Sequence, residues 1–311
     1  MSPVSPKSSI STLLLRTLLV MATALVLIVI LIGTAFLIAD KSSGRITSSG
    51  ETRSYLLYVP KNYDPLSPTP LVIGIHGFAD WPAHLATVSR WNNLAEENGF
   101  IVVYPSGTRF PKRWRTLDSP DSAIDVQFIS DLVDKLEQDY SIDPARIYIN
   151  GFSNGGGMSV LLACKRAERF AAIASVAGAY TYPLDQCAPK RPVPLIAFHG
   201  TADPVVPYLG GAANMFKIPF PVVSEWVQSW AKRNQCLSNP VVLPLSGEVS
   251  GIRYTKCAQN ADVDFYIIEG GGHAWPGGGA VPAWIVGYTS QQIDTTRLIW
   301  EFFKAHPLPT P

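Results

Sequence analysis

Short apolar runs alternate with segments of helical spacing over most of the chain. The runs have the length and composition of buried strands and lie at residues 55–59, 71–75, 100–104, 146–150, 171–177, 195–198 and 263–268. Between them, apolar residues recur at helical intervals over residues 86–97, 123–136, 156–167, 223–232 and 291–303. Strands that alternate with helices need crossover connections, which predicts an α/β fold with a mostly parallel central sheet and helices on both faces. Functional residues are then expected just beyond the carboxyl ends of the strands.

The longest apolar segment follows a short N-terminal tail, residues 1–16. Residues 17–39 are 23 uncharged residues, of which 19 are hydrophobic. As one helix they would rise about 35 Å, enough to cross a hydrocarbon core of about 30 Å, so we expect a transmembrane anchor. A cleaved signal peptide is the alternative, but it would have a shorter apolar region and small residues before the cleavage site. The residues there, Phe36, Leu37 and Ile38, are bulky.

The rest of the chain reads as one folded domain. Residues 40–50 are polar, with five Ser or Thr and two Gly, and predict a linker. Residues 51–311 contain no comparable interruption. Composition agrees with a globular domain, because 47% hydrophobic and 16% charged residues exclude disorder. A net charge of +1 lacks the cation excess of a nucleic-acid binder.

The run at residues 146–150 leads into Gly151-Phe152-Ser153-Asn154-Gly155-Gly156, followed by a helical pattern. This is the G-x-S-x-G nucleophile elbow in its strand–turn–helix context, which makes Ser153 the candidate nucleophile. A glycine-rich structural turn in another α/β fold is the alternative. A dinucleotide-binding loop is disfavoured because no G-x-G-x-x-G begins at this turn.

A serine hydroxyl needs a base, and the base needs an orienting acid. His273 follows the last strand in a glycine-rich loop, and the order Ser, acid, His of α/β-hydrolases favours it. His76 and His199 also follow strands and remain alternatives. Asp203 lies between Ser153 and His273, just after the strand at residues 195–198, and is the candidate acid. An Asx turn before Pro204 is compatible with the same role.

A tetrahedral intermediate needs two N–H donors. We expect the backbone of Asn154, directly after the nucleophile, and the backbone of Phe78, in the loop after the strand at residues 71–75. Two tryptophans are candidates for substrate binding. Trp275 lies two residues beyond His273, and Trp114 lies in the loop after the strand at residues 100–104. Packing is the alternative for both. Asp125 reads most simply as a favourable acid in the first turn of a helix.

Four segments together resemble the polyhydroxybutyrate depolymerase and feruloyl esterase group: Ile75-His76-Gly77, Gly151 to Gly156, His199-Gly200-Thr201-Ala202-Asp203-Pro204, and Gly271-Gly272-His273-Ala274-Trp275-Pro276-Gly277-Gly278. The resemblance covers roughly residues 50–306. It implies an α/β-hydrolase fold and a secreted serine esterase that works through an acyl-enzyme without a cofactor. The sequence departs from the group at residues 114–120, where paired cysteines and small residues are common, so the resemblance does not carry over the substrate.

The cysteines are Cys164, Cys187, Cys236 and Cys257, and none forms a C-x-x-C pair, so neither zinc nor another metal is expected. From spacing alone, three ways of joining the four cysteines in two disulfides remain open, and so does a state in which all four thiols are reduced. The resemblance favours nearest neighbours, Cys236–Cys257 especially, and with it Cys164–Cys187. Disulfides require an oxidising compartment. We therefore expect the N-terminus inside and the enzyme outside, anchored in the membrane or secreted after signal cleavage.

The combined expectation is a carboxylic ester hydrolase whose partners are a small or polymeric ester and the membrane, with no nucleic acid and no metal. A serine peptidase with the same triad and a non-catalytic, membrane-tethered binding domain are the rival functions.

Overall fold

The computed structural model describes residues 14–27, 42–117, 119–212, 218–243, 247–279 and 281–309. The chain divides into two compact units, Met1–Lys41 and Ser42–Pro311. In the first unit, residues 14–27 form a helix with exposed apolar side chains. Among the described residues, none of the helices has the length and apolar character needed to cross a membrane. Residues 28–39 of the expected anchor, and residues 1–13 of the expected tail, lie outside the described residues.

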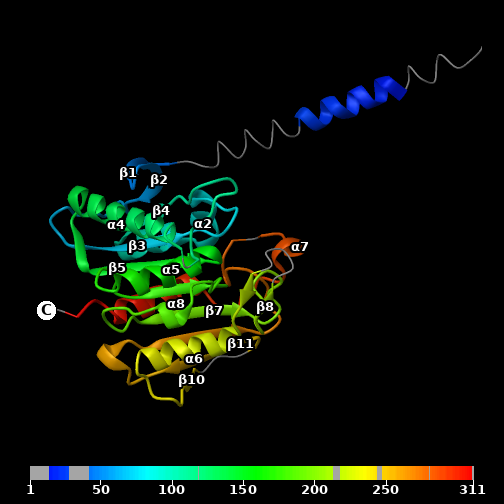
Figure 1. The fold of residues 1–311 in the computed structure, drawn as a ribbon. Helices are drawn as coiled ribbons and strands as arrows, with labels where there is room; N and C mark the ends of the chain where they lie inside the picture. The colour runs from blue at the N-terminus through cyan, green and yellow to red at the C-terminus, as the bar shows by residue number, and fades with distance from the viewer. Residues whose placement is uncertain are drawn as a thin grey trace, which may run out of the picture. The chain divides into compact units, whose positions relative to one another are not determined.

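A large sheet forms the centre of the second unit (Figure 1). Its strand order is β1-β2-β4-β3-β5-β6-β7-β12-β11-β10. The strands from β4 to β12 in this order pair in parallel, and the strands at both edges pair antiparallel. The bounds are β1 (Gly44–Ser48), β2 (Glu51–Tyr58), β3 (Thr69–Ile75), β4 (Ile101–Pro105), β5 (Ile142–Phe152), β6 (Ile173–Val176), β7 (Leu195–Gly200), β10 (Val241–Leu243), β11 (Val249–Tyr254) and β12 (Val263–Ile268). A separate short hairpin joins β8 (Gly211–Ala212) to β9 (Pro219–Phe220).

Helices cover both faces of the sheet and bury one apolar core on each. One core is formed with α4 (Ser122–Asp139), α5 (Asn154–Arg166) and α6 (Val223–Arg233), and the other with α2 (Pro82–Ser89), α3 (Trp91–Asn98) and α8 (Thr295–Ala305). Shorter helices are α7 (Ala283–Val286), η1 (Leu184–Gln186) and η2 (Ala258–Asn260). The predicted α/β architecture with a mostly parallel sheet is confirmed, and the seven predicted strands are all present.

The structure corrects two boundaries. Residues 44–48, expected in a linker, form β1, because the turn at Ser49 and Gly50 brings them back onto β2; both turn residues have positive φ, of 49° and 77°, as a two-residue hairpin turn requires. The single helix expected at residues 86–97 is two helices. Arg90, with a φ of 58°, ends α2 and begins α3 in the left-handed region.

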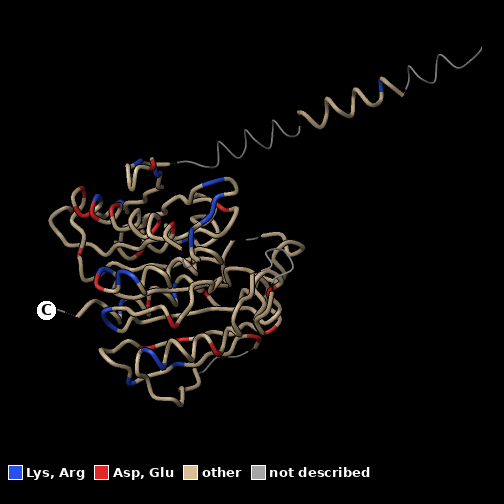
Figure 2. Tube along the Cα trace, viewed as in Figure 1, with Lys and Arg blue, Asp and Glu red and all other residues tan. Residues whose placement is uncertain are grey.

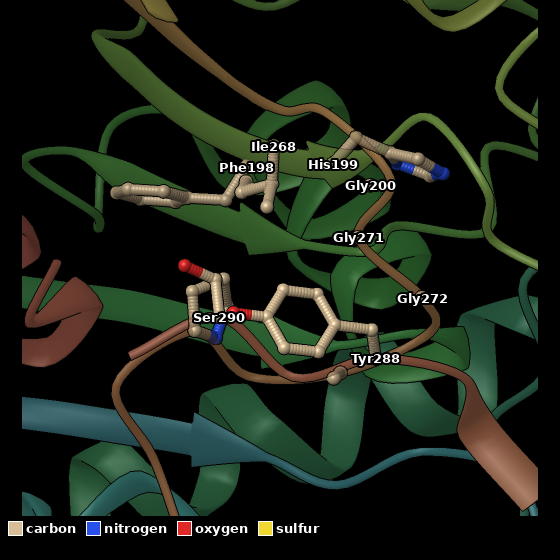
Figure 3. Close-up of a pocket in the computed structure, with 10 residues that line it drawn as sticks. Phe198, His199, Gly200, Ile268, Gly271, Gly272, Tyr288 and Ser290 are labelled. Atoms are coloured by element: carbon tan, nitrogen blue, oxygen red, sulfur yellow. The ribbon is translucent and has the colours of Figure 1, made fainter. Parts of the chain in front are cut away.

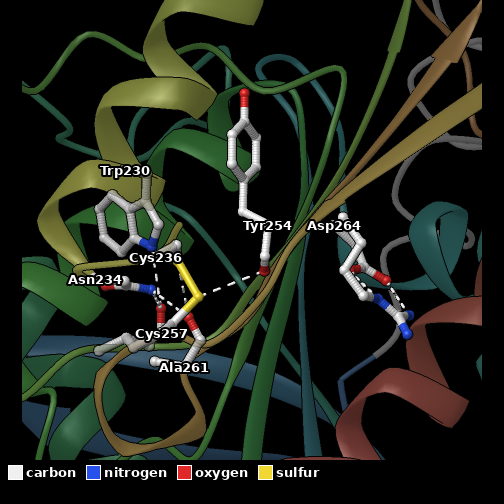
Figure 4. The surroundings of a disulfide bond; sticks show 9 residues. Trp230, Asn234, Cys236, Tyr254, Cys257, Ala261 and Asp264 are labelled. Carbon is white, nitrogen blue, oxygen red and sulfur yellow. Dashed lines mark hydrogen bonds and ion pairs between the residues drawn. A yellow bond between two sulfur atoms is a disulfide. The ribbon is translucent and has the colours of Figure 1, made fainter. Parts of the chain in front are cut away.

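Both expected disulfides are present. Cys164 on α5 pairs with Cys187, and Cys236, just after α6, pairs with Cys257, just after β11 (Figure 4). Beside the second bridge, the side-chain amide of Asn234 donates to the carbonyls of Val193 and Ala261, at 2.8 Å each. Each bridge closes a loop of about twenty residues, which corresponds to roughly 3 kcal/mol of stabilisation in the chain-entropy account.

Candidate active site

Ser153 lies at the sharp turn between β5 and α5. Its φ is 56° and its ψ −118°, a conformation that costs a non-glycine residue about 1–3 kcal/mol. Tertiary hydrogen bonds hold it there: the Ser153 N–H donates to the Val176 carbonyl, and the Ala179 N–H donates to the Ser153 carbonyl, at 2.9 Å each. The surrounding structure therefore maintains a strained turn at Ser153, which lines a cavity.

The glycines of the elbow are required by close backbone contacts. A Cβ atom on Gly151 would lie 2.1 Å from the carbonyl oxygen of Gly155, and one on Gly155 would lie 2.0 Å from that of Ile75. Real Cβ atoms do not approach backbone so closely. Strand, turn and helix pack in this way only when both positions lack a side chain, which explains the G-x-S-x-G spacing.

Asp203 and His273 form a buried pair beyond the ends of β7 and β12. His273 Nδ1 donates to Asp203 Oδ2 at 2.7 Å, and Asp203 Oδ1 accepts from the N–H groups of Val205 and Val206 at 2.8 Å each. With its hydrogen on Nδ1, the imidazole has Nε2 as an acceptor. Asp203 and His273 are 6% and 5% exposed, so the pair is shielded from solvent.

The charge of Asp203 is stabilised in the folded protein. Burial raises the pKa of this carboxyl, but the charge and hydrogen bond of His273, the charge of His199 and the hydrogen bond from the Val206 N–H together leave the pKa below its ordinary value of 3.8. A carboxyl with a lowered pKa stabilises the fold above its unfolded-state value. This contribution is lost as the pH falls through the lowered folded value.

Both alternative bases have backbone groups as partners. His76 Nε2 accepts from the Gly107 N–H at 2.9 Å, and its Nδ1 lies 2.7 Å from the Gly77 carbonyl. His199 Nε2 lies 2.9 Å from the Val206 carbonyl, and burial lowers the pKa of this fully enclosed imidazole. His199 Nε2 also lies 3.4 Å from Asp203 Oδ2, so this imidazole stands beside the Asp203–His273 pair, whereas His76 contacts the loop between β4 and α4.

The two expected oxyanion donors lie on the same cavity as Ser153 and His273. Asn154 is the first residue of α5, where backbone N–H groups have no partner within the helix. Its side chain has a structural task that the sequence did not indicate: Oδ1 accepts from the Trp114 N–H at 2.7 Å, and Nδ2 donates to the Trp114 carbonyl at 3.3 Å. Phe78 lies in the loop that follows β3.

The cavity has a volume of about 850 Å³ and is walled mainly by apolar side chains. That volume lies within the range of small-molecule sites. A second, separate pocket of about 10 Å³ lies behind the His273 loop, between Phe198, Ile268, Tyr288 and Ser290 (Figure 3), and is too small for a substrate. Among the described residues, no group of three or more His, Cys, Asp or Glu side chains is arranged to hold a metal ion.

The two candidate substrate tryptophans are almost completely buried. Trp114 and Trp275 contribute to the cavity wall but are only 3% and 2% exposed. The indole N–H of Trp114 donates to the His76 carbonyl, and that of Trp275 donates to Thr296 Oγ1. Their rings support the wall from behind, so packing, the alternative considered for both, accounts for the contacts seen.

A buried ionic network holds the Trp114 loop. Asp125 is fully buried and accepts from Arg53 Nη1 at 2.8 Å and from Arg115 Nη1 at 3.0 Å; its other oxygen accepts from the Arg115 N–H at 2.8 Å. The carboxylate of Glu51 also pairs with Arg115, with 2.7 Å between Glu51 Oε1 and Arg115 Nη2. Burial lowers the pKa of Arg53, which is 1% exposed, and the charges of Asp125 and Glu51 oppose that effect. The first-turn acid is therefore the centre of a buried ion pair network, with partners distant in sequence.

Known proteins resemble this chain in sequence and in fold. The family model described as esterase PHB depolymerase matches residues 53–182. Feruloyl esterase C of Emericella nidulans is 30% identical over 260 residues, which cover 81% of this chain and 84% of that protein. Feruloyl esterase B of Piromyces equi is 28% identical over 265 residues, and the chain spans about half of its length, 46%.

A solved structure supports the fold. The acetyl xylan esterase from Aspergillus awamori superposes with a TM-score of 0.57 at 16% identity, over 74% of this chain and 93% of that one. At this identity the likeness concerns the fold alone.

We expect Asp125→Asn to destabilise the protein by about 3–5 kcal/mol, because it leaves the guanidinium of Arg53 buried beside a neutral amide. Asp139→Asn is the control on the same helix, since its pair with Lys135 is solvent-exposed and contributes about 0.5 kcal/mol or less. Denaturant unfolding of both variants measures the difference. Equal stability losses would show that the network does not hold the loop.

Proposed function

Because this chain belongs to the esterase family of polyhydroxybutyrate depolymerases and feruloyl esterases, we propose that it is a serine carboxylic-ester hydrolase. The observation that carries the proposal is the buried hydrogen bond between His273 and Asp203, on the cavity that Ser153 also lines. A nucleophile, a base and an orienting acid in the order Ser, Asp, His are the parts that ester hydrolysis of this kind needs.

In the proposed mechanism, Ser153 Oγ attacks the ester carbonyl while His273 Nε2 accepts the hydroxyl proton. Asp203 keeps the hydrogen of the neutral imidazole on Nδ1 and stabilises the imidazolium that forms. The backbone N–H groups of Asn154 and Phe78 donate to the carbonyl oxygen as it becomes negative. In related sites one such donor contributes about 3 kcal/mol to transition-state stabilisation.

The tetrahedral intermediate collapses when His273 returns the proton to the leaving alcohol, which leaves an acyl group on Ser153. Water then attacks the acyl-enzyme, again with His273 as base, and releases the carboxylic acid. These steps use only groups of the protein and water.

The substrate class is inferred from the relatives and from the cavity. The two relatives described above are named feruloyl esterases, and the structural neighbour is named an acetyl xylan esterase. An apolar cavity of about 850 Å³ has room for an aromatic or aliphatic acyl group, and the buried rings of Trp114 and Trp275 support its wall. A panel of short p-nitrophenyl esters, a feruloyl ester and a polyhydroxybutyrate film distinguishes these acyl groups. A matched amide tests the peptidase alternative.

For the location, we propose a domain outside the cytoplasm that residues 17–39 anchor in the membrane. Two disulfides support exposure to an oxidising compartment. The length and apolar composition of residues 17–39 support the anchor. Secretion after signal cleavage is the alternative.

Ser153→Ala should lower short-ester hydrolysis by more than about 10⁴-fold and abolish labelling by a fluorophosphonate probe, because no other group replaces the nucleophile. Ser229→Ala, at an exposed position of α6, is the matched control. Assays on both variants, with circular dichroism to verify the fold, measure the effect. Continued labelling of the Ser153 variant would identify another serine as the nucleophile.

Asp203→Asn should lower kcat by about 10⁴-fold while the protein stays folded, because the amide no longer holds the imidazole in the productive tautomer. Asp185→Asn, on η1, is the control. Steady-state kinetics of both variants measure the effect, and full activity in the Asp203 variant would show that another residue is the acid.

Full-length protein should stay with the membrane fraction, and residues 42–311 should be open to protease on cells without an outer barrier. No thiol should react with an alkylating reagent until the protein is unfolded and reduced, because all four cysteines are paired. N-terminal sequencing and mass spectrometry measure these points. A mature protein that begins near Asp40 would show that residues 17–39 belong to a cleaved signal peptide and not to an anchor. Four thiols that react without reduction would show that the disulfides are absent and would remove the support for export.

A further inference from the structure

Basic residues gather in the loop between β4 and α4, on the rim of the proposed active-site cavity. Figure 2 shows Lys and Arg close together in this loop, which contains Arg109, Lys112, Arg113 and Arg115. Arg109, Arg113 and Arg115 line the cavity, together with His84. The net charge that these side chains bring to the cavity wall depends on which of them are paired with a carboxylate.

Most of the cations in the wall are neutralised by carboxylates. Arg115 contacts Asp125 at 3.0 Å and Glu51 at 2.7 Å, and Arg109 lies 3.8 Å from Asp121.

His84 is also paired. Its Nδ1 lies 2.7 Å from Asp80 Oδ1, and this hydrogen bond raises the pKa of His84 against the opposing effect of burial.

Arg113 differs from the other three. It lines the cavity, and in the part of the chain that the structure describes no carboxylate lies within ion-pair distance of its guanidinium. Its side chain is half-buried, so water hydrates the charge while the cavity is open. When a substrate displaces that water, the guanidinium needs a new partner.

The backbone of Arg113 is held firmly. Its N–H donates to the Thr108 carbonyl at 3.1 Å, and the Thr108 N–H donates back to the Arg113 carbonyl at 3.2 Å. A cation on a fixed backbone selects a ligand better than one on a mobile loop, because less entropy is lost on binding.

The neighbours of Arg113 connect it to both proposed oxyanion donors. The Lys112 carbonyl accepts from the N–H of Ala79, which follows Phe78, at 2.8 Å. The Trp114 N–H donates to the side chain of Asn154. Arg113 therefore belongs to the short segment that contacts both donor loops, and it lines the same cavity as Ser153.

We propose that Arg113 binds a carboxylate carried by the substrate, so that the enzyme prefers anionic esters over neutral esters of the same size. This inference rests on the proposed esterase function and specifies its substrate. A carboxylate pairs with the planar guanidinium through two parallel hydrogen bonds, whereas a neutral ester leaves the cation desolvated without a partner. The carboxylate belongs either to the acyl half or to the alcohol half of the ester.

Two matched pairs of esters test the proposal on the full-length protein. Monophenyl adipate against phenyl hexanoate places the carboxylate on the acyl half. The butanoyl ester of 4-hydroxybenzoate against that of 4-hydroxybenzamide places it on the alcohol half. The measured quantity is the ratio of kcat/KM for the anionic ester to that for the neutral ester, corrected for uncatalysed hydrolysis.

We expect wild type to prefer the anionic member of one pair, and Arg113→Gln to lower that ratio by about 10- to 100-fold. Arg113→Lys should retain part of the preference, because it keeps the charge but loses the paired geometry. Arg45→Gln, on exposed β1 away from the cavity, makes the same change in net charge and should leave the ratio as in wild type. A general loss of folding lowers both rate constants together and leaves the ratio unchanged.

A wild-type enzyme without preference in either pair, or an Arg113→Gln ratio equal to that of wild type, would overturn the inference. Neither result affects the proposed function, provided that Ser153→Ala no longer hydrolyses the neutral esters. If Ser153→Ala hydrolyses both members at the wild-type rate, the proposed function itself fails.

Discussion

The close backbone packing at the end of β5 is the constraint on which the rest of the site depends. Strand β5, the turn at Ser153 and helix α5 approach so closely that neither Gly151 nor Gly155 has room for a Cβ atom. This packing accompanies the positive φ of Ser153 and brings the first N–H groups of α5 to the carboxyl edge of the sheet. The positions of the proposed nucleophile and of the proposed oxyanion donor are thereby coupled, because one steric condition places both.

The other proposed catalytic groups reach this edge through the parallel sheet. Strands β7 and β12 are neighbours in parallel register, so the loops that follow them are adjacent although Asp203 and His273 are 70 residues apart. The backbone N–H groups of Val205 and Val206 hold one oxygen of Asp203, which leaves the other for the imidazole. The sheet thus supplies proximity, and the loop after β7 supplies orientation.

The loop between β4 and α4 shows how buried charge stabilises a binding surface. Asp125 holds Arg53 and Arg115, and the side chain of Asn154 holds the backbone of Trp114. Breaking a buried pair is costly because the remaining charge has no solvent, so this network keeps the loop in one conformation. The same loop carries Arg113, which lines the cavity and has no carboxylate within ion-pair distance among the described residues, so the rigidity of the loop bears on the proposed binding of an anionic substrate.

Local sequence determined much of this protein. Hydrophobic periodicity predicted the seven principal strands, since a buried strand and an amphipathic helix differ in period. The elbow motif and the chain order of Ser153, Asp203 and His273 indicated the site, because the turn geometry depends on neighbouring residues and the chain order is read directly from the sequence. Tertiary structure decided what depends on contacts distant in sequence. The edge strand β1 forms from residues with the composition of a linker, because β2 offers unpaired backbone groups beside it. Asp125 is the centre of an ion network only because Arg53, 72 residues away, packs against it, and no pattern in one segment encodes such a partner.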